Sequence, residues 1–185
     1  MKIATKIIFL LLLVSVVAAA KRRDPLTEAE TDQLREVAMD PYNRIKLMVK
    51  FTEERLAAID QVRLDPKLAD ERGKRVHDLL EDFASLIDEI NDNLDQYEGR
   101  PLDKDTVKQY HKALKELIDA DARFDLKLQS LKSASETDPV TRKEAPDFRY
   151  VLLDAIESLK SNADMAREYM ETTHEQKSTT PEKKK

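Results

Sequence analysis

Cysteine is absent from this chain, and glycine occurs only at positions 73 and 99. Without cysteine there is no disulfide, no cysteine nucleophile and no lipid anchor on cysteine. Two glycines are too few for a glycine-rich phosphate-binding loop or for the many tight turns of a β-sheet protein. Aromatic residues make up 5% of the chain and charged residues 37%. Abundant alanine, leucine, glutamate, aspartate and lysine therefore predict an almost entirely α-helical protein.

Groupings of residues that would carry a reaction are also missing. No G-x-S-x-G motif occurs, and no serine adjoins any of the three histidines. Carboxylates are plentiful, but no spacing selects a catalytic pair among them. The net charge of −5 gives no electrostatic reason to bind nucleic acid. We expect a protein that is not an enzyme, needs no cofactor and does not bind nucleic acid.

The first twenty residues have the layout of a secretory signal peptide. Lys2 and Lys6 form a short positive start, an apolar run follows from Ile7, and three alanines end it at Ala20. This pattern predicts an exported protein that is periplasmic or secreted. Because no N-x-S/T sequon occurs and cysteine is absent, a bacterial source is favoured. Cleavage after Ala20 removes two lysines and changes the net charge from −5 to −7.

A second interpretation of this segment is an uncleaved membrane anchor. The residues that follow Ala20 are Lys21, Arg22 and Arg23, and basic residues at that place are unusual after a cleaved signal. The apolar run from Ile7 to Ala20 is shorter than the roughly 20 residues that span a bilayer. Cleavage is therefore the favoured interpretation, and contact with a membrane is expected only if the signal stays uncleaved.

Asp-Pro pairs divide the rest of the chain into helices. Aspartate is a strong N-cap and proline is favoured at the first helical position, so each pair marks a helix start or the turn before one. The pairs are Asp24-Pro25, Asp40-Pro41, Asp65-Pro66 and Asp138-Pro139. Thr27 and Glu30 have the spacing of a capping box. The predicted helices are 26–39, 41–64, 66–98, 103–133 and 146–172, with a polar loop over 134–145. Whether Gly73 breaks the third helix is left open.

Apolar residues recur along these segments at the spacing of helices that pack together. The fourth segment has an apolar heptad seam with Asp121 at its one missing step. The fifth has a similar seam with Asn162 inside it. We therefore predict an all-α, up-down helical bundle of four long helices plus one short N-terminal helix, spanning 21–172. The polar segment 173–185 is predicted to be a disordered tail.

The third segment carries a stripe of acidic residues. No lysine or arginine occurs between Val76 and Gly99. The acidic stripe consists of Asp78, Glu81, Asp82, Asp88, Asp92 and Asp95. In an antiparallel hairpin, the lysines of the next helix would run back along this stripe and pair with it. Those lysines are Lys104, Lys108, Lys112 and Lys115. The alternative is a surface for a cationic partner.

Asp121 and Asn162 are polar residues at positions where the seams predict apolar ones. A buried polar group needs a hydrogen-bond partner, so the two are expected to meet, or Asp121 to lean outward toward Arg123 or Lys127. Such residues often fix helix register. With Tyr110 and His111 they are also the candidate polar positions for a ligand site in the core.

These observations favour an exported, non-enzymatic protein of the cell envelope that acts as a binding or structural module. It would use its helix faces to bind a protein partner or to self-associate, as the seams of the last two helices suggest. The alternative is a helical bundle that binds a small ligand or a metal ion. No specific metal ligands are predicted.

Overall fold

The computed structural model describes residues 24–96 and 103–179, with side chains described as far as Thr172. This part of the chain is all-α, as predicted, with four long helices, one short N-terminal helix and no strand. Its elements are α2 (Glu28–Glu36), α3 (Pro41–Leu64), the 3-10 helix η1 (Pro66–Leu68), α4 (Arg72–Asp95), α5 (Lys104–Thr137) and α6 (Pro139–Thr179). The predicted signal peptide, 1–20, lies outside the described residues.

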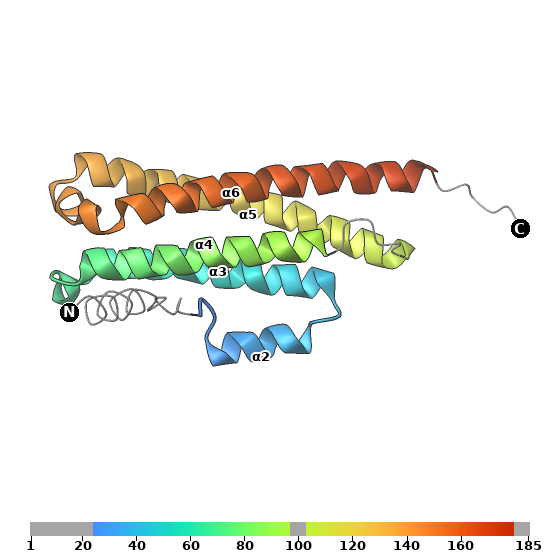
Figure 1. Ribbon diagram of the computed structural model, residues 1–185, viewed down its shortest axis with the longest axis horizontal. Coiled ribbons are helices and arrows are strands. Elements are labelled where there is room, and N and C mark those ends of the chain that lie inside the picture. Colours follow the sequence, from blue (N-terminus) through green and yellow to red (C-terminus); the bar gives the residue numbers. More distant parts are fainter. Residues whose placement is uncertain (1–23, 97–102, 180–185) are drawn as a thin grey trace, which may run out of the picture.

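The four long helices form two antiparallel hairpins that dock on each other (Figure 1). The first hairpin is α3 with α4, and the second is α5 with α6. Helix α6 also packs along α4, and α5 packs along α3, with each of these pairs running in parallel. In the described part of the chain α4 and α5 are therefore diagonal to each other, although they are consecutive. Short connections predict that each helix packs against the next one along the chain. This prediction is wrong for α4 and α5.

Side-chain contacts fix the direction of each pair. Between α3 and α4 the residue numbers run in opposite senses, since Arg44 bonds to Asn93 and Arg55 lies near Asp82. Between α4 and α6 the residue numbers of the contacting pairs increase in the same direction, so these two helices are parallel. These contacts join Arg72 to Glu144, Asn91 to Asn162 and Asp95 to Tyr169.

The starts of α2, α3, α5 and α6 follow the capping rules, whereas α4 begins without a side-chain cap. The Thr27 hydroxyl accepts a hydrogen bond from the Glu30 amide at 3.2 Å, and the Glu30 carboxylate accepts one from the Thr27 amide at 2.7 Å, which completes the predicted capping box. Asp40, Asp103 and Asp138 each accept a hydrogen bond from a backbone amide in the first turn of α3, α5 and α6. The Asp-Pro pairs at 40 and 138 thus mark true helix starts.

The third predicted helix is interrupted. Pro66–Leu68 form a 3-10 turn, and α4 begins only at Arg72, so Gly73 lies in the first turn of α4 instead of the middle of a helix. A Cβ on Gly73 would lie 3.1 Å from the Cβ and Cγ of Asp147 and closer still to its Oδ2. Glycine at this position therefore allows α6 to approach α4 closely.

The predicted loop 134–145 is wrong. Helix α5 continues to Thr137 and α6 begins at Pro139, which leaves Asp138 as the one residue between them. The hydroxyls of Ser135 and Thr137 bond back to carbonyls of their own helix, so these polar residues remain helical. Pro146, expected near a helix start, lies inside α6. At its far end α6 reaches Thr179, so residues 173–179 of the predicted disordered tail have helical backbone.

Both predicted seams are buried in the core. Leu114, Leu117, Leu128 and Leu131 of α5 pack against Phe148, Leu152 and Leu159 of α6, all at most 4% exposed. Phe83 and Phe124 meet across the diagonal with ring centroids 5.8 Å apart and planes at 83°. Each such side chain contributes roughly 1.5–3 kcal/mol by burial. The core is thus continuous through all four long helices.

Candidate functional site

An acidic groove lies between the parallel helices α4 and α6. Its volume is about 220 Å³. Four carboxylates, two hydroxyls and two small apolar side chains line it: Glu81, Asp82, Ala84, Ser85 and Asp88 from α4, and Val151, Asp154 and Ser158 from α6. We call this set the acidic groove. It concentrates negative charge on two rigid helices, and a hollow of this kind attracts cations.

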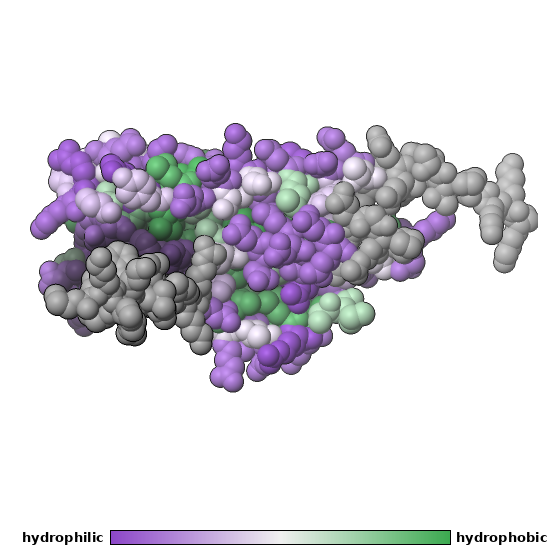
Figure 2. All heavy atoms as spheres, viewed as in Figure 1, coloured by the Kyte–Doolittle hydropathy of each residue, from purple (hydrophilic) through white to green (hydrophobic). Residues whose placement is uncertain are grey.

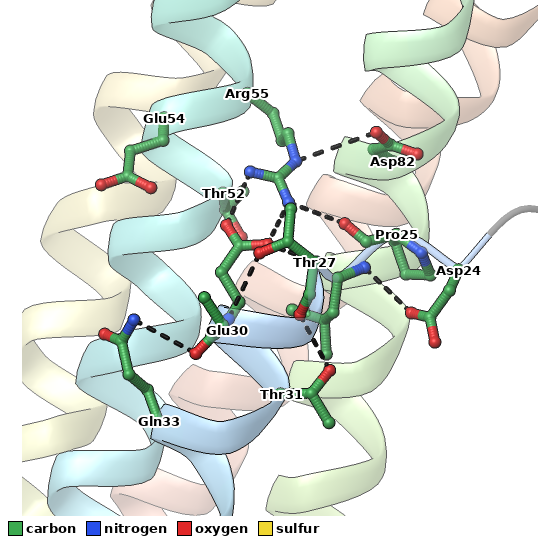
Figure 3. A network of polar contacts seen from close by, with 12 residues as sticks. Asp24, Pro25, Thr27, Glu30, Thr31, Gln33, Thr52, Glu54, Arg55 and Asp82 are labelled. Atoms are coloured by element: carbon green, nitrogen blue, oxygen red, sulfur yellow. Dashed lines mark hydrogen bonds and ion pairs between the residues drawn. The ribbon is translucent and has the colours of Figure 1, made fainter.

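Arg55 connects this groove to the N-terminal helix. Its Nε lies 3.8 Å from Asp82 Oδ2, and the rest of its guanidinium faces Glu30 of α2. Both members of the Arg55–Glu30 pair are nearly buried. Helix α2 is therefore fixed beside one wall of the acidic groove (Figure 3).

A second cluster on α4 overlaps the acidic groove, because it shares Glu81 with it. His77 Nδ1 lies 3.6 Å from Asp78 Oδ1 and 4.0 Å from Glu81 Oε2. Possible ligand atoms of all three residues lie within 4.8 Å of one another. An imidazole and two carboxylates are groups that bind zinc and similar cations. The cluster is partly exposed, and surface charge pairing accounts equally well for its geometry.

The predicted pairing of the α5 lysines with the acidic stripe is wrong. Because α4 and α5 are diagonal, these lysines do not run along the stripe. Lys108 pairs with Asp105 at 3.2 Å, and Lys112 lies 4.0 Å from Glu116, both on their own helix. Lys112 also lies over the ring of Tyr42, 4.8 Å from its centroid.

The acidic stripe does not act as one surface. Glu81, Asp82 and Asp88 line the acidic groove. Asp78 lies beside His77, and Asp95 accepts a hydrogen bond from the hydroxyl of Tyr169 at 2.7 Å. Asp92 is exposed on α4. Three of the six stripe residues therefore contribute to the acidic groove.

Asp121 and Asn162 meet in the core. This is the first of the two predicted arrangements, in place of an Asp121 that leans outward toward Arg123 or Lys127. Asp121 is 3% exposed and Asn162 is fully buried. One end of the Asn162 amide lies 3.1 and 3.2 Å from the two carboxyl oxygens of Asp121. The other end lies 2.6 Å from the side-chain oxygen of Asn91 on α4. Together they form a polar triad, Asp121–Asn162–Asn91, that spans three helices.

Burial raises the pKa of the Asp121 carboxyl to about 7, while the positive charge of Arg167 acts in the opposite direction. A carboxyl with this pKa exchanges its proton near neutral pH. Such a shift is typical of functional sites, although buried structural groups also produce it. The triad thus combines enclosed geometry with a group that titrates near neutrality.

Tyr110 and His111 do not join the triad. They precede Asp121 by three turns of α5, roughly 16 Å along the helix axis. Tyr110 is buried and His111 is half-buried. The four candidate polar positions therefore separate into two places.

Asn91 is the member of the triad that the sequence prediction missed. It lies four residues after Ile87 and three before Leu94, both fully buried, so it continues an apolar row of α4. That spacing was available as a signal. The acidic residues on either side of Asn91 favour a prediction of charge pairing at this place instead.

Large apolar side chains on the surface belong to several elements of the fold. Met39, Leu64, Leu126 and Tyr150 are more than 70% exposed, but they belong to different parts of the fold. Hydrophilic residues dominate the face seen in Figure 2, and apolar ones occupy small areas between them. None of the helices in the described part has the length and apolar character that a bilayer crossing requires.

Comparison of the chain with protein-family models, with curated proteins and with solved structures finds no match to any of them.

Proposed function

We propose that this protein is an exported, non-enzymatic binding module of the cell envelope that binds a cationic segment of a partner protein in the acidic groove. The observation that carries the proposal is the groove itself, where Glu81, Asp82, Asp88 and Asp154 surround a hollow of about 220 Å³. A lysine- or arginine-rich segment fits this chemistry, because its charge is attracted to the carboxylates.

The other lining residues suit such a ligand as well. Ala84 and Val151 offer apolar contact to the methylene stem of a lysine or arginine. Ser85 and Ser158 offer hydroxyl oxygens that accept hydrogen bonds. The groove is smaller than the roughly 300–1,000 Å³ of sites that enclose small molecules. Its size favours one or two side chains of an extended partner over a whole enclosed ligand.

Burial of the seams weighs against the self-association alternative. The apolar stripes of α5 and α6 that suggested it are used inside the molecule, between α5, α6 and the first hairpin. The exposed large apolar side chains that remain lie on several elements, and Tyr150 and Leu153, one turn apart on α6, are the two that lie on one helix face. Charge on the surface of α4 and α6 is therefore the stronger basis for recognition.

Binding of a fluorescent peptide tests the proposal. A peptide of alternating lysine and serine is titrated with the protein and followed by fluorescence anisotropy, with a glutamate–serine peptide for comparison. We expect the lysine peptide to bind and to weaken as salt is added, because salt screens exposed charges. The double variant Glu81→Gln/Asp154→Asn should weaken binding about tenfold or more.

A matched control separates the groove from net charge. The double variant Asp119→Asn/Glu157→Gln removes two exposed carboxylates outside the acidic groove and changes the net charge by the same amount. It should bind the lysine peptide like the natural protein. Equal weakening in both double variants would show that net charge alone attracts the peptide, and the groove proposal would fail.

Export is tested separately by the mass of the protein recovered from its own cell envelope. Signal cleavage predicts a chain that begins at Lys21, released without detergent. An intact N-terminus in the membrane fraction would replace this part of the proposal with the anchored form.

Metal binding is the second candidate function, favoured by the cluster of His77, Asp78 and Glu81. Calorimetric titration with zinc chloride tests it. Binding of one zinc ion that is lost in His77→Gln and kept in His111→Gln would support a site there. Absence of heat, or equal binding by both variants, would remove this candidate.

A further inference from the structure

The triad Asp121–Asn162–Asn91 forms a hydrogen-bond chain from α5 through α6 to α4. The Asn162 amide is its centre, with the Asp121 carboxyl 3.1 and 3.2 Å from one end and the Asn91 side-chain oxygen 2.6 Å from the other. An amide has one donor end and one acceptor end. The way the Asn162 amide faces therefore decides which neighbour receives a hydrogen bond from it.

With a proton on Asp121, the chain runs from α5 to α4. The carboxyl O–H donates to Asn162 Oδ1, and Asn162 Nδ2 donates to Asn91 Oδ1. Every contact then joins a donor to an acceptor.

Loss of that proton to water leaves a carboxylate, which only accepts hydrogen bonds. Asn162 must then turn its Nδ2 toward Asp121, where it lies 3.1 and 3.2 Å from the two oxygens. The Oδ1 of Asn162 now faces Asn91. Asn91 turns its own side-chain amide so that its Nδ2 donates a hydrogen bond to this oxygen. Each group is again paired, but every hydrogen bond of the chain has changed direction.

The charged groups near the triad are paired with other residues, so the protonation state of Asp121 decides the direction of its hydrogen bonds. From α6, Arg167 acts on the Asp121 carboxyl, and its guanidinium is paired with Asp164 at the surface. From α3, Glu53 and Asp60 face α5, but they lie beside Arg123 and Lys127. From α4 the group that meets the triad is the uncharged Asn91.

We propose that ionisation of Asp121 reverses the hydrogen-bond chain Asp121–Asn162–Asn91, so that a proton lost on α5 changes the side-chain orientation of Asn91 on α4. The device makes the bundle core responsive to pH without opening it. It does not depend on ligand binding in the acidic groove.

Side-chain NMR of the natural protein between pH 4.5 and 9 tests the reversal. The Asp121 carboxyl carbon and the side-chain amides of Asn162 and Asn91 are followed together. We expect all three to shift with one common midpoint near pH 7. A titrating Asp121 with unresponsive asparagine amides would overturn the proposal, as would an Asp121 carboxyl that does not titrate in this range.

Two variants separate relay through Asn162 from a general effect of charge. In Asp121→Asn both asparagine amides should lose their common shift near pH 7. In Asn162→Ala, Asp121 still titrates but Asn91 should no longer follow it. If Asn91 follows Asp121 equally well without Asn162, the chain is not the route and the proposal is overturned.

Unfolding in urea supplies a readout that needs no assignment of resonances. Because burial favours the protonated form, folding takes up a proton between the unfolded and folded pKa of Asp121. The ratio of folded to unfolded protein should fall about tenfold per pH unit between roughly pH 4 and 7, relative to Asp121→Asn. Asp119→Asn, an exposed aspartate on the same helix, should keep the pH profile of the natural protein. Identical profiles for the natural protein and Asp121→Asn would contradict the proposal.

Discussion

The guanidinium of Arg55 on α3 holds the carboxylate of Glu30 on α2 through two parallel hydrogen bonds of 2.8 and 2.7 Å. The same guanidinium donates to the Pro25 carbonyl at 2.7 Å (Figure 3). Bidentate pairs of this kind are among the stronger polar contacts in proteins. Since α2 is short and packs chiefly against α3, this pair is a principal attachment of the N-terminal helix.

Replacement of Arg55 by methionine should release α2 from the bundle. The change keeps an apolar stem but leaves the nearly buried Glu30 without its cation, which costs about 2–4 kcal/mol of local stability. Hydrogen exchange should show lost protection in Glu28–Glu36 with protection retained in α4–α6. The control is Arg35→Met, an exposed arginine on α2 itself, which should be close to neutral. Uniform loss of protection in all helices would contradict this local role.

Acid should detach the same helix. Burial raises the pKa of Glu30, but hydrogen bonds from Arg55 and from the amide and hydroxyl of Thr27 outweigh it and lower that pKa below its usual 4.5. A carboxylate with a lowered pKa stabilises the fold above its unfolded pKa and loses this contribution as the pH falls through the folded one. Exchange in α2 should therefore increase below about pH 4.5, and Glu30→Gln should remove most of that pH dependence.

Arg72 should be a major contributor to global stability. Its guanidinium donates to Glu144 of α6 at 2.8 Å and to the carbonyls of Val62 and Asp65 at 3.3 and 3.0 Å, which joins three elements at one end of the bundle. Arg72→Met takes this donor away from Glu144 and from the Val62 carbonyl, whereas the Asp65 carbonyl keeps the Leu68 amide at 3.3 Å. The change should lower the free energy of unfolding in urea by about 3 kcal/mol. Arg75→Met, one turn along and exposed, should change it by less than about 0.5 kcal/mol.

Phe83 and Phe124 should be energetically coupled. Their edge-to-face contact joins α4 to α5 across the diagonal, where the two helix backbones do not pack together. Each leucine substitution should destabilise the protein, and the double variant should lose less than the sum of the two by about 0.5–1.5 kcal/mol. A double-mutant cycle in urea measures this coupling. Additive losses would show that the rings only fill space.

Helix type, helix number and most helix starts could be predicted from the sequence, because capping and apolar spacing are local properties. Asp40-Pro41 marked the start of α3, and Leu64 its end, as the structure has them. The loop prediction at 134–145 is wrong because polar residues do not by themselves end a helix. In the structure the hydroxyls of Ser135 and Thr137 bond to carbonyls of the same helix.

Helix arrangement depended on information that is not local. Nothing in the spacing of Asp88 or Lys112 reveals that their helices lie on a diagonal, so the predicted charge pairing failed. The meeting of Asp121 with Asn162 could be foreseen because both interrupt seams that face each other. The contribution of Asp154 and Ser158 to the acidic groove could not be foreseen. These residues come next to α4 only when α6 docks parallel to it.

The two docked hairpins also have a consequence for the order of folding. Contacts within each hairpin follow a short turn, either Asp65–Glu71 or the single residue Asp138, so they close small loops. Contacts between the hairpins, such as Arg72 with Glu144 and Asp95 with Tyr169, join residues more than seventy positions apart. Closing long loops costs more entropy and slows folding. The two hairpins should therefore form early and dock on each other later. The acidic groove lies between the hairpins, so it should be the last part of the molecule to become ordered.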